Sequence, residues 1–316
     1  MQRRQLLTMI AVSAMTGSAS AWAQNTTPLT LVVPFAPGAS VDTLSRLIAR
    51  AVTERTGQTV LVDNRPGANG IIGAELVKNA PAEARQLFIA NVGSHAINVP
   101  LYGKRLPYDA AKDFSAITLL WRFPSVLAVP ASSPAKDVAS LVQLAQTQGI
   151  TFASAGNGSG GHLLGEMLKQ ATGATQMLHV PYKGAAAAAT DVVAGQLPVT
   201  FGSFPGVMPF VISGKLRVLG VAADKPTPLA PEIPVLKDLA VTSWYGLFAP
   251  AGTPQPIIDK VHTAIAKVLA TPEMKERLKT LGAESVDSNP QSFAASLPAE
   301  LAHWKKVVDA SGAKID

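Results

Sequence analysis

The sequence predicts an α/β protein with two lobes, each built on a doubly wound, mainly parallel sheet that has helices on both faces. The first observation is the alternation of short apolar runs with amphipathic helical segments, which is typical of parallel sheets. The second is the chain length of 316 residues, which is sufficient for two lobes of ordinary size, each with its own hydrophobic core.

The first 23 residues have the pattern of a secretory signal peptide. Arginines at positions 3 and 4 are followed by an apolar run from Leu6 to Met15, and an Ala-Trp-Ala cleavage site ends at Ala23. The apolar run is too short to span a bilayer. We therefore expect cleavage after Ala23 and a mature chain in the periplasm, with Sec and twin-arginine export both open.

The composition excludes several classes of protein. The chain has no cysteine, so a lipoprotein anchor, a thiol nucleophile and a disulfide scaffold are not available. The formal net charge is +6, but the basic residues come singly or in pairs, and a nucleic-acid-binding patch is therefore not expected. The five histidines never fall in H-x-H or H-E-x-x-H spacing, so neither a metal site nor a cofactor is expected.

The first part of the mature chain alternates strands with helices. Apolar runs predict strands at 29–34, 59–64 and 86–91. A helix is expected between the first two strands, with Ser40 as its N-cap and Gly57 at its end. A turn and a short helix over 71–78 lead into the third strand.

The rest of the chain repeats this alternation. Strands are predicted at 124–130, 150–153, 177–182, 197–202, 215–223 and 246–252. Helices are predicted at 134–149, 164–171, 185–194, 256–270, 272–281 and 298–310. Thr271 is the expected cap of the helix over 272–281, because Pro272 then takes the first helical position.

The loop before the helix over 164–171 contains a glycine pattern that nucleotide-binding proteins use. Gly156, Gly158 and Gly161 match G-x-G-x-x-G between a predicted strand and a predicted helix. A dinucleotide site also needs an acidic residue about 20 residues further on, at the end of the next strand. The next strand, over 177–182, ends without a carboxylate, so a nucleotide site is not favoured.

Two loops of one kind remain as the best candidates for a binding site. The segments 34–42 and 154–162 each follow a strand, are rich in small residues and open a helix. A helix N-terminus has free N–H donors and a partial positive charge, so it can bind a carboxylate or a phosphate. Both loops could instead be tight turns with good caps. One such loop in each half of the chain favours a shared cleft.

An exported α/β hydrolase is the alternative function. Ser154 or Ser159 could act as a nucleophile with His162 as its base, because all three belong to one loop. No G-x-S-x-G motif occurs, and a polar pair beside a turn is more often a helix cap or a ligand contact. A binding protein is therefore the favoured hypothesis, and enzymatic activity is not expected.

Six segments in order then resemble one family. They are LVVPFAPGASVD, VDNRPGANG, LPYDAAKDFSAIT, FASAGNGSGGHLLGE, VPYKG and SWYGLFAPAGTP. They are similar to segments of the extracytoplasmic receptors of tripartite tricarboxylate transporters, also called Bug receptors. The resemblance covers nearly the whole mature chain and implies a periplasmic binding protein of the two-lobe, type II-like kind, with a ligand cleft between the lobes.

The resemblance also implies how the chain is divided. The chain would cross between lobes near 120–125 and again near 242–247. Lobe 1 would then comprise 24–122 and 245–316, and lobe 2 would comprise 123–244. The implied partners are a small carboxylate ligand and the membrane subunits of a transporter, or a sensor, and the receptor itself would be a monomer without catalytic activity.

In the family that the chain resembles, backbone amides and ordered waters between the two loops hold a ligand carboxylate. The resemblance places the first side of the site at Phe35, Gly38, Ala39, Ser40 and Asp42. It places the second side at Ser154, Gly156, Asn157, Ser159 and His162. It places more variable wall positions at Gly93, Ser94, Tyr182, Gly184 and Ser203. Gly202 stands where many members have an acidic residue, which disfavours an amino-acid ligand.

Overall fold

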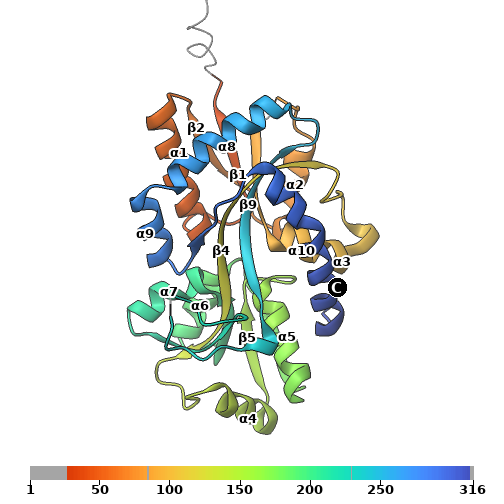
Figure 1. The fold of residues 1–316 in the computed structure, drawn as a ribbon. Coiled ribbons are helices and arrows are strands. Elements are labelled where there is room, and N and C mark those ends of the chain that lie inside the picture. The colour runs from red at the N-terminus through yellow and green to blue at the C-terminus, as the bar shows by residue number, and fades with distance from the viewer. Residues whose placement is uncertain (1–26, 84, 229, 314–316) are drawn as a thin grey trace, which may run out of the picture.

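The computed structural model describes residues 27–83, 85–228 and 230–313, and it has two α/β lobes stacked end to end (Figure 1). The predicted signal peptide lies outside the described residues. The two lobes share one ten-stranded network with the strand order β2-β1-β3-β9-β4-β7-β5-β6, while β8 and β10 pair with β4. Among the described helices, none is both long and apolar enough to cross a membrane.

The first lobe has a parallel core that follows the predicted strands closely. Its parallel strands are β1 (Leu29–Val33), β2 (Val60–Asn64) and β3 (Gln86–Asn91), with β1 between the other two. Its main helices are α1 (Ser40–Thr56), α2 (Ile71–Lys78), α8 (Gln255–Leu269), α9 (Pro272–Thr280) and α10 (Pro290–Ser311). Short segments complete it: η1 (Ala68–Gly70), η2 (Gly93–Ile97), α3 (Asn98–Tyr102), η3 (Gly103–Arg105) and β10 (Glu284–Ser285).

The helices of this lobe cover both faces of its sheet. Leu31 and its same-face neighbours pack with α1, α8 and α9 in one hydrophobic cluster, whereas Val32 packs with α2 and α10 in another. Adjacent residues of a strand point to opposite faces, so a strand buried on both sides reads as a continuous apolar run. The C-terminal helices therefore complete the lobe that the N-terminal strands begin.

The second lobe repeats the arrangement. Its parallel strands are β5 (Ile150–Ser154), β6 (Met177–Pro181) and β7 (Val199–Ser203), and β8 (Leu216–Ala222) pairs antiparallel with β4. Its helices are α4 (Val138–Gln148), α5 (Gly160–Thr172), α6 (Ala185–Val193), α7 (Phe204–Ile212) and η4 (Lys237–Leu239). Residues of α4 and α5 pack on one face of the sheet, and residues of α6 and α7 pack on the other.

Two long strands connect the lobes. They are β4 (Phe114–Pro130) and β9 (Thr242–Pro250), which pair antiparallel from Phe114 opposite Pro250 to Pro124 opposite Thr242. Figure 1 shows both strands running from one lobe into the other. The crossings expected near 120–125 and 242–247 fall on this strand pair.

Three predicted helix starts are wrong. The helix predicted over 134–149 begins at Val138, because Asp137 and Ser140 form a capping box there. Ser40 is the first residue of α1, and Ala39 occupies the N-cap position without a side-chain cap. The Asp42 carboxylate, three residues after the cap, reaches back and accepts a hydrogen bond from Gly38 N instead. The last helix begins at Pro290 instead of Pro298, because Asn289 and Ser292 form a capping box there and Pro298 is accommodated inside the helix.

The helix α7 is absent from the sequence prediction. Its segment is apolar all round and contains prolines at positions 205 and 209, so it has neither the amphipathic period nor the composition of a typical helix. The first proline lies in the opening turn, where its missing N–H costs nothing. The segment is helical because burial of its first four residues against the sheet, beside β7 and β8, outweighs its low local helix propensity.

The third glycine of the G-x-G-x-x-G pattern packs a helix against a strand. A Cβ on Gly161 would overlap the carbonyl group of Phe201 in β7. We expect Gly161→Ala to lower the free energy of unfolding by about 3 kcal/mol, because the backbone of β7 cannot move away from α5. Urea denaturation of the two proteins would measure the difference.

Gly173, which ends the same helix, provides the matched control. Its φ of 68° is left-handed, but an added Cβ would meet nothing within 4 Å. Gly173→Ala should therefore cost only about 1 kcal/mol of left-handed strain. Equal losses in the two variants would mean that close packing at Gly161 contributes nothing special.

Candidate functional site

A cavity of about 290 Å³ lies between the lobes, at the carboxyl ends of the parallel strands. Phe35 follows β1, Asn91 ends β3, Ala155 follows β5 and Ser203 ends β7, and all four line the cavity. Open α/β sheets bind their ligands at this edge, because the loops that leave the strands meet there. The two lobes each contribute such an edge, and the cavity is the space between them.

Four helices begin at this cavity. The lining includes Ser40 at the start of α1, Gly160 at the start of α5, Ala185 at the start of α6 and Gly206 in the first turn of α7. Each helix N-terminus carries about half a positive charge and unpaired N–H groups. Among the described residues that line the cavity, Lys183 is the only one with a charged side chain. The cavity therefore favours an anion.

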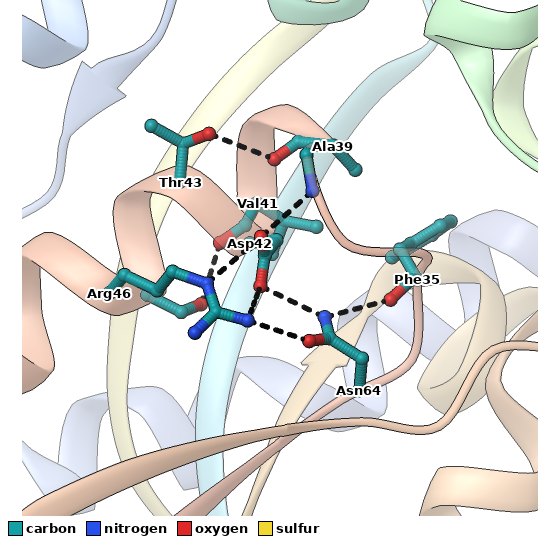
Figure 2. Close-up of polar contacts among 9 residues, drawn as sticks. Phe35, Ala39, Val41, Asp42, Thr43, Arg46 and Asn64 are labelled. Carbon is teal, nitrogen blue, oxygen red and sulfur yellow. Dashed lines mark hydrogen bonds and ion pairs between the residues drawn. The ribbon is translucent and has the colours of Figure 1, made fainter.

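The loop between β1 and α1 is held from behind by Asp42 (Figure 2). The Asp42 side chain is buried, and its carboxylate accepts hydrogen bonds from Gly38 N at 2.9 Å, Arg46 Nε at 3.1 Å and Asn64 Nδ2 at 2.9 Å. Asn64 Nδ2 also donates to the Phe35 carbonyl at 3.0 Å. This network fixes the backbone on both sides of the loop.

The Asp42 carboxylate stays ionised in this network. Burial alone would raise the pKa of the Asp42 carboxyl, but hydrogen bonds from Arg46, Gly38 and Asn64, together with the positive charge of Arg46, hold it below its ordinary value. Asp42 does not line the cavity. It therefore positions the loop without placing its negative charge beside a bound anion.

The loop between β5 and α5 is also fixed from behind by polar side chains. Ser159 caps α5 by accepting a hydrogen bond from His162 N at 3.2 Å, and Gly158 N donates to His162 Nδ1 at 3.1 Å. Ser154 Oγ lies 2.6 Å from His179 Nε2 and accepts a hydrogen bond from Gly156 N at 3.1 Å. Of these side chains, only Ser159 lines the cavity.

The two histidines behind this loop stack on each other and stay neutral. Their ring centroids are 4.1 Å apart. Burial lowers the pKa of His162 to about 4, and burial together with the neighbouring His162 lowers that of His179 to about 3. His162 Nδ1 accepts from the backbone, which a neutral ring can do and a protonated ring cannot.

The side chain of Asn69, which lines the cavity, joins the two lobes. Asn69 Nδ2 donates to the Gly158 carbonyl of the second lobe at 2.9 Å and to Asn98 Oδ1 of the first lobe at 3.0 Å. Asn69 has a left-handed φ of 48°, and Gly93 packs so closely that a Cβ there would lie 2.6 Å from the Asn69 amide. This bond holds the glycine loop of one lobe against the other lobe.

Comparison with known proteins identifies the family. The model of the tripartite tricarboxylate transporter family receptor, TctC, matches residues 44–313. The chain belongs to this family. The resemblance that six sequence segments indicated is therefore confirmed.

Curated relatives match this receptor over most of its length. It is 35% identical over 317 residues to the UPF0065 protein in the tcbD-tcbE intergenic region of Pseudomonas sp. strain P51, with 97% of this chain and 94% of the relative covered. It is 27% identical to the protein BugT of Bordetella pertussis, with 97% and 96% covered.

Solved structures confirm the two-lobe α/β architecture of a periplasmic binding protein. An R. palustris protein with adipate is 34% identical, with a TM-score of 0.86 and coverage of 92% of this chain and 100% of that chain. MatC from Rhodopseudomonas palustris with bound malate is 29% identical, with a TM-score of 0.82 and coverage of 89% and 98%. The periplasmic binding protein BugD is 30% identical, with a TM-score of 0.84 and coverage of 91% and 98%.

The receptor cavity gathers about half of the residues that the sequence singled out. Those that line it are Phe35, Gly38, Ala39, Ser40, Gly93, Ser159, Gly184 and Ser203. Those that do not line it are Asp42, Ser94, Ser154, Gly156, Asn157, His162 and Tyr182. Most of the second group bond to neighbouring residues, as Tyr182 does with Asp191 at 2.7 Å. Ligand contact for either group stays a prediction.

Several lining residues were not predicted. Asn91 ends the strand predicted at 86–91 and Lys183 follows the strand predicted at 177–182, but the strand pattern alone does not show which side chain faces the cavity. Ser125 and Ser243 come from the two long connecting strands, and Asn69 comes from the turn before α2. These three lie far apart in the sequence, and only the packing of the lobes brings them together.

The geometry does not support the hydrolase hypothesis. His162 uses Nδ1 to accept from Gly158 N, so it does not activate Ser154. Ser154 contacts His179 instead, but it is fully buried and lies outside the cavity lining, where a substrate could not reach its hydroxyl. Membership of a receptor family agrees with the expectation of a binding protein.

The buried histidines predict how stability depends on pH. A histidine whose pKa is lowered on folding binds its proton more readily in the unfolded chain, so stability falls as the pH falls below the unfolded value. For His162 this window runs from about pH 6.5 down to about 4. For His95 and His179, whose pKa values burial lowers to about 3, it extends down to about pH 3. Within its window, each of these histidines can lower the free energy of unfolding by up to about 1.4 kcal/mol for every pH unit of acidification.

We expect His162→Asn to reduce the slope of the free energy of unfolding against pH, by at most the amount that the uptake of one proton on unfolding contributes. Asparagine retains an oxygen that can accept from Gly158 N, so the loop keeps its acceptor. The measurement is urea denaturation at pH 7, 6, 5 and 4.5. His303→Asn, at an exposed position, is the matched control. An unchanged slope in His162→Asn would show that His162 is not the group that titrates.

Proposed function

We propose that this receptor binds a small carboxylate in the cavity between its lobes. The observation that carries this proposal is the charge of the site, since four helix N-termini and Lys183 meet where no acidic side chain is found among the described lining residues. A carboxylate matches outward-facing N–H groups in both charge and hydrogen bonding. A cavity of about 290 Å³ suits a small acid and not a nucleotide.

The ligand contacts would come from both lobes. We propose that the loop of Gly38, Ala39 and Ser40 holds one side of the carboxylate. The donors there would be the N–H groups at the start of α1, because Gly38 N and Ala39 N already bond to Asp42 and Ala36. Ser159 and the start of α5 would hold the other side. The remaining predicted positions would act behind these contacts or through ordered water. Affinity would then require both lobes, because each supplies only part of the donor set.

Two related structures support a carboxylate ligand. The R. palustris protein is 34% identical and was solved with adipate, and MatC is 29% identical and was solved with malate. The ends of these two ligands share the carboxylate, while the chains between the ends differ. We therefore propose that the loops at 34–42 and 154–162 bind the carboxylate and that the other walls of the cavity select the remainder of the ligand.

We further propose the division into lobes and the cellular role. Lobe 1 would comprise 24–122 with 245–316, lobe 2 would comprise 123–244, and the two would close by bending within β4 and β9. The receptor would act as a monomer in the periplasm after cleavage behind Ala23, without catalysis of its own. It would deliver the acid to membrane subunits of a tripartite tricarboxylate transporter, or report it to a sensor.

A thermal-shift screen of the chain from Gln24 onward tests the ligand class. We expect one or a few small mono-, di- or tricarboxylates to raise the melting temperature by several degrees, because a ligand at a hundredfold its Kd adds about 2.7 kcal/mol. NAD and ATP are the comparison ligands and should have no effect. A shift with nucleotides alone, or with no acid at all, would overturn the proposal.

The Asn69 contact tests the need for both lobes. Asn69→Gly keeps the left-handed backbone but removes the hydrogen bond to Gly158, so the closed arrangement should weaken. We expect Kd for the carboxylate found in the screen to rise about two- to tenfold. Isothermal titration calorimetry would measure the change.

Ala68→Gly is the matched control for this experiment. Ala68 is the neighbouring left-handed residue, with φ 45°, and its substitution leaves the bond between the lobes intact. Its Kd should equal that of the unaltered protein. Equal Kd values for all three proteins would argue against the role proposed for Asn69.

A further inference from the structure

One wall of the cavity is built from the two strands that connect the lobes. Phe123 and Ser125 of β4, and Ser243 and Tyr245 of β9, all line the cavity. Phe123 lies opposite Ser243 in the antiparallel register, so alternate residues of both strands share this face. The wall thus carries two aromatic rings, Phe123 and Tyr245, beside the hydroxyl groups of the two serines.

Three hydroxyl groups on this wall have no partner among the described residues. Ser125, Ser243 and Tyr245 are only 1%, 5% and 8% exposed, and none of their side-chain oxygens makes a hydrogen bond within the described chain. None of these oxygens belongs to the fully enclosed unpaired atoms, so each keeps some accessible surface, and all three residues line the cavity. Buried hydroxyls are normally paired, and leaving one unpaired costs about 1–3 kcal/mol.

The start of α5 leaves room beside two of these hydroxyls. An added Cβ on Gly160 would lie 2.9 Å from Ser243 Oγ and 3.1 Å from Ser125 Oγ. Any larger residue would therefore cover both oxygens. Glycine at this position keeps them accessible next to the N–H groups of the helix.

The third hydroxyl sits on a ring that its neighbours hold in place. The Tyr245 ring packs against Trp121, Phe123 and Phe35, with centroid distances of 5.2, 5.4 and 6.1 Å. Burial raises the pKa of Tyr245, so its hydroxyl remains a donor at neutral pH. The position of this hydroxyl is therefore set before any ligand arrives.

The chemistry of these groups differs from that of the helix N-termini. The helix N-termini and Lys183 supply positive charge and only donate hydrogen bonds, which suits a carboxylate. Ser125, Ser243 and Tyr245 are neutral, and each can both donate and accept. A ligand with only methylene groups here would leave all three unpaired, which a site built to pair them rejects strongly.

We infer that Ser125, Ser243 and Tyr245 form a hydroxyl subsite that binds an alcohol group, so that the ligand is a hydroxylated carboxylic acid. This inference rests on the proposed carboxylate function. An alcohol matches the subsite because it donates and accepts at one atom, whereas a carboxylate only accepts. The subsite lies on the connecting strands, so its occupation would also contact the elements about which the lobes close.

Matched pairs of acids that differ by one hydroxyl test this inference. The pairs are succinate with malate, glutarate with 2-hydroxyglutarate, and tricarballylate with citrate, each titrated calorimetrically into the chain from Gln24 onward. In the pair that binds, we expect the hydroxylated acid to bind about tenfold more tightly or better. Equal affinity within that pair would overturn the subsite while leaving the carboxylate function intact. Binding by no acid of any pair would count against both.

The double variant Ser125→Ala/Ser243→Ala locates the effect. We expect it to reduce the preference for the hydroxylated acid about tenfold and to leave the affinity for the plain acid nearly unchanged. Tyr245→Phe keeps the ring, removes the third hydroxyl and should reduce the preference about threefold, which keeps the test available if the double variant does not fold. Ser311→Ala is the control, since Ser311 is a buried serine whose hydroxyl is already paired with Val308 O at 2.9 Å. An unchanged preference for the hydroxylated acid in both subsite variants would overturn the inference.

Discussion

The antiparallel hydrogen-bond ladder between β4 and β9 is the constraint on which the rest of the structure depends. These strands are the inner members of the strand order, with β3 of the first lobe beside β9 and β7 of the second lobe beside β4. Because both lobes are paired to one ladder, the carboxyl ends of their parallel strands face each other across it. The cavity, the loops and the wall of hydroxyls all follow from that placement.

The cavity obtains its positive character mainly from the backbone. Helix N-termini are fixed dipoles whose N–H groups need no flexible side chain to reach the ligand, so little conformational entropy is lost on binding. Small residues such as Gly38, Ala39 and Gly160 line the cavity, so no large side chain covers these groups. The titratable side chains of the two loops, Asp42 and His162, stand behind the backbone and fix its shape. Their charges and pKa values therefore support the site from outside its lining.

The sequence was most informative about local structure. Strand and helix alternation predicted most of the elements, since a buried parallel strand and an amphipathic helix have distinct periods. The glycine loop at 154–162 and the loop at 34–42 were recognisable because both are rich in small residues that permit such turns, although Ser40 is not the cap of α1. The whole of α7 was missed because tertiary burial outweighed the local preference of a proline-containing segment. The start of α10 was missed because Pro298 suggested the first helical position, whereas the local capping box of Asn289 and Ser292 begins the helix earlier.

By itself, the sequence determined the family, the α/β class and the segments that lie at the cavity. The direction of each side chain was decided only by the tertiary structure. Ser154 and His162 belong to the right loop but face the interior behind it, whereas Ser125 and Ser243 belong to connecting strands where no site residue was predicted, and they face the cavity. The physical reason is that a loop pattern specifies a turn of the backbone, while the space into which a side chain points is made by residues far away in the chain.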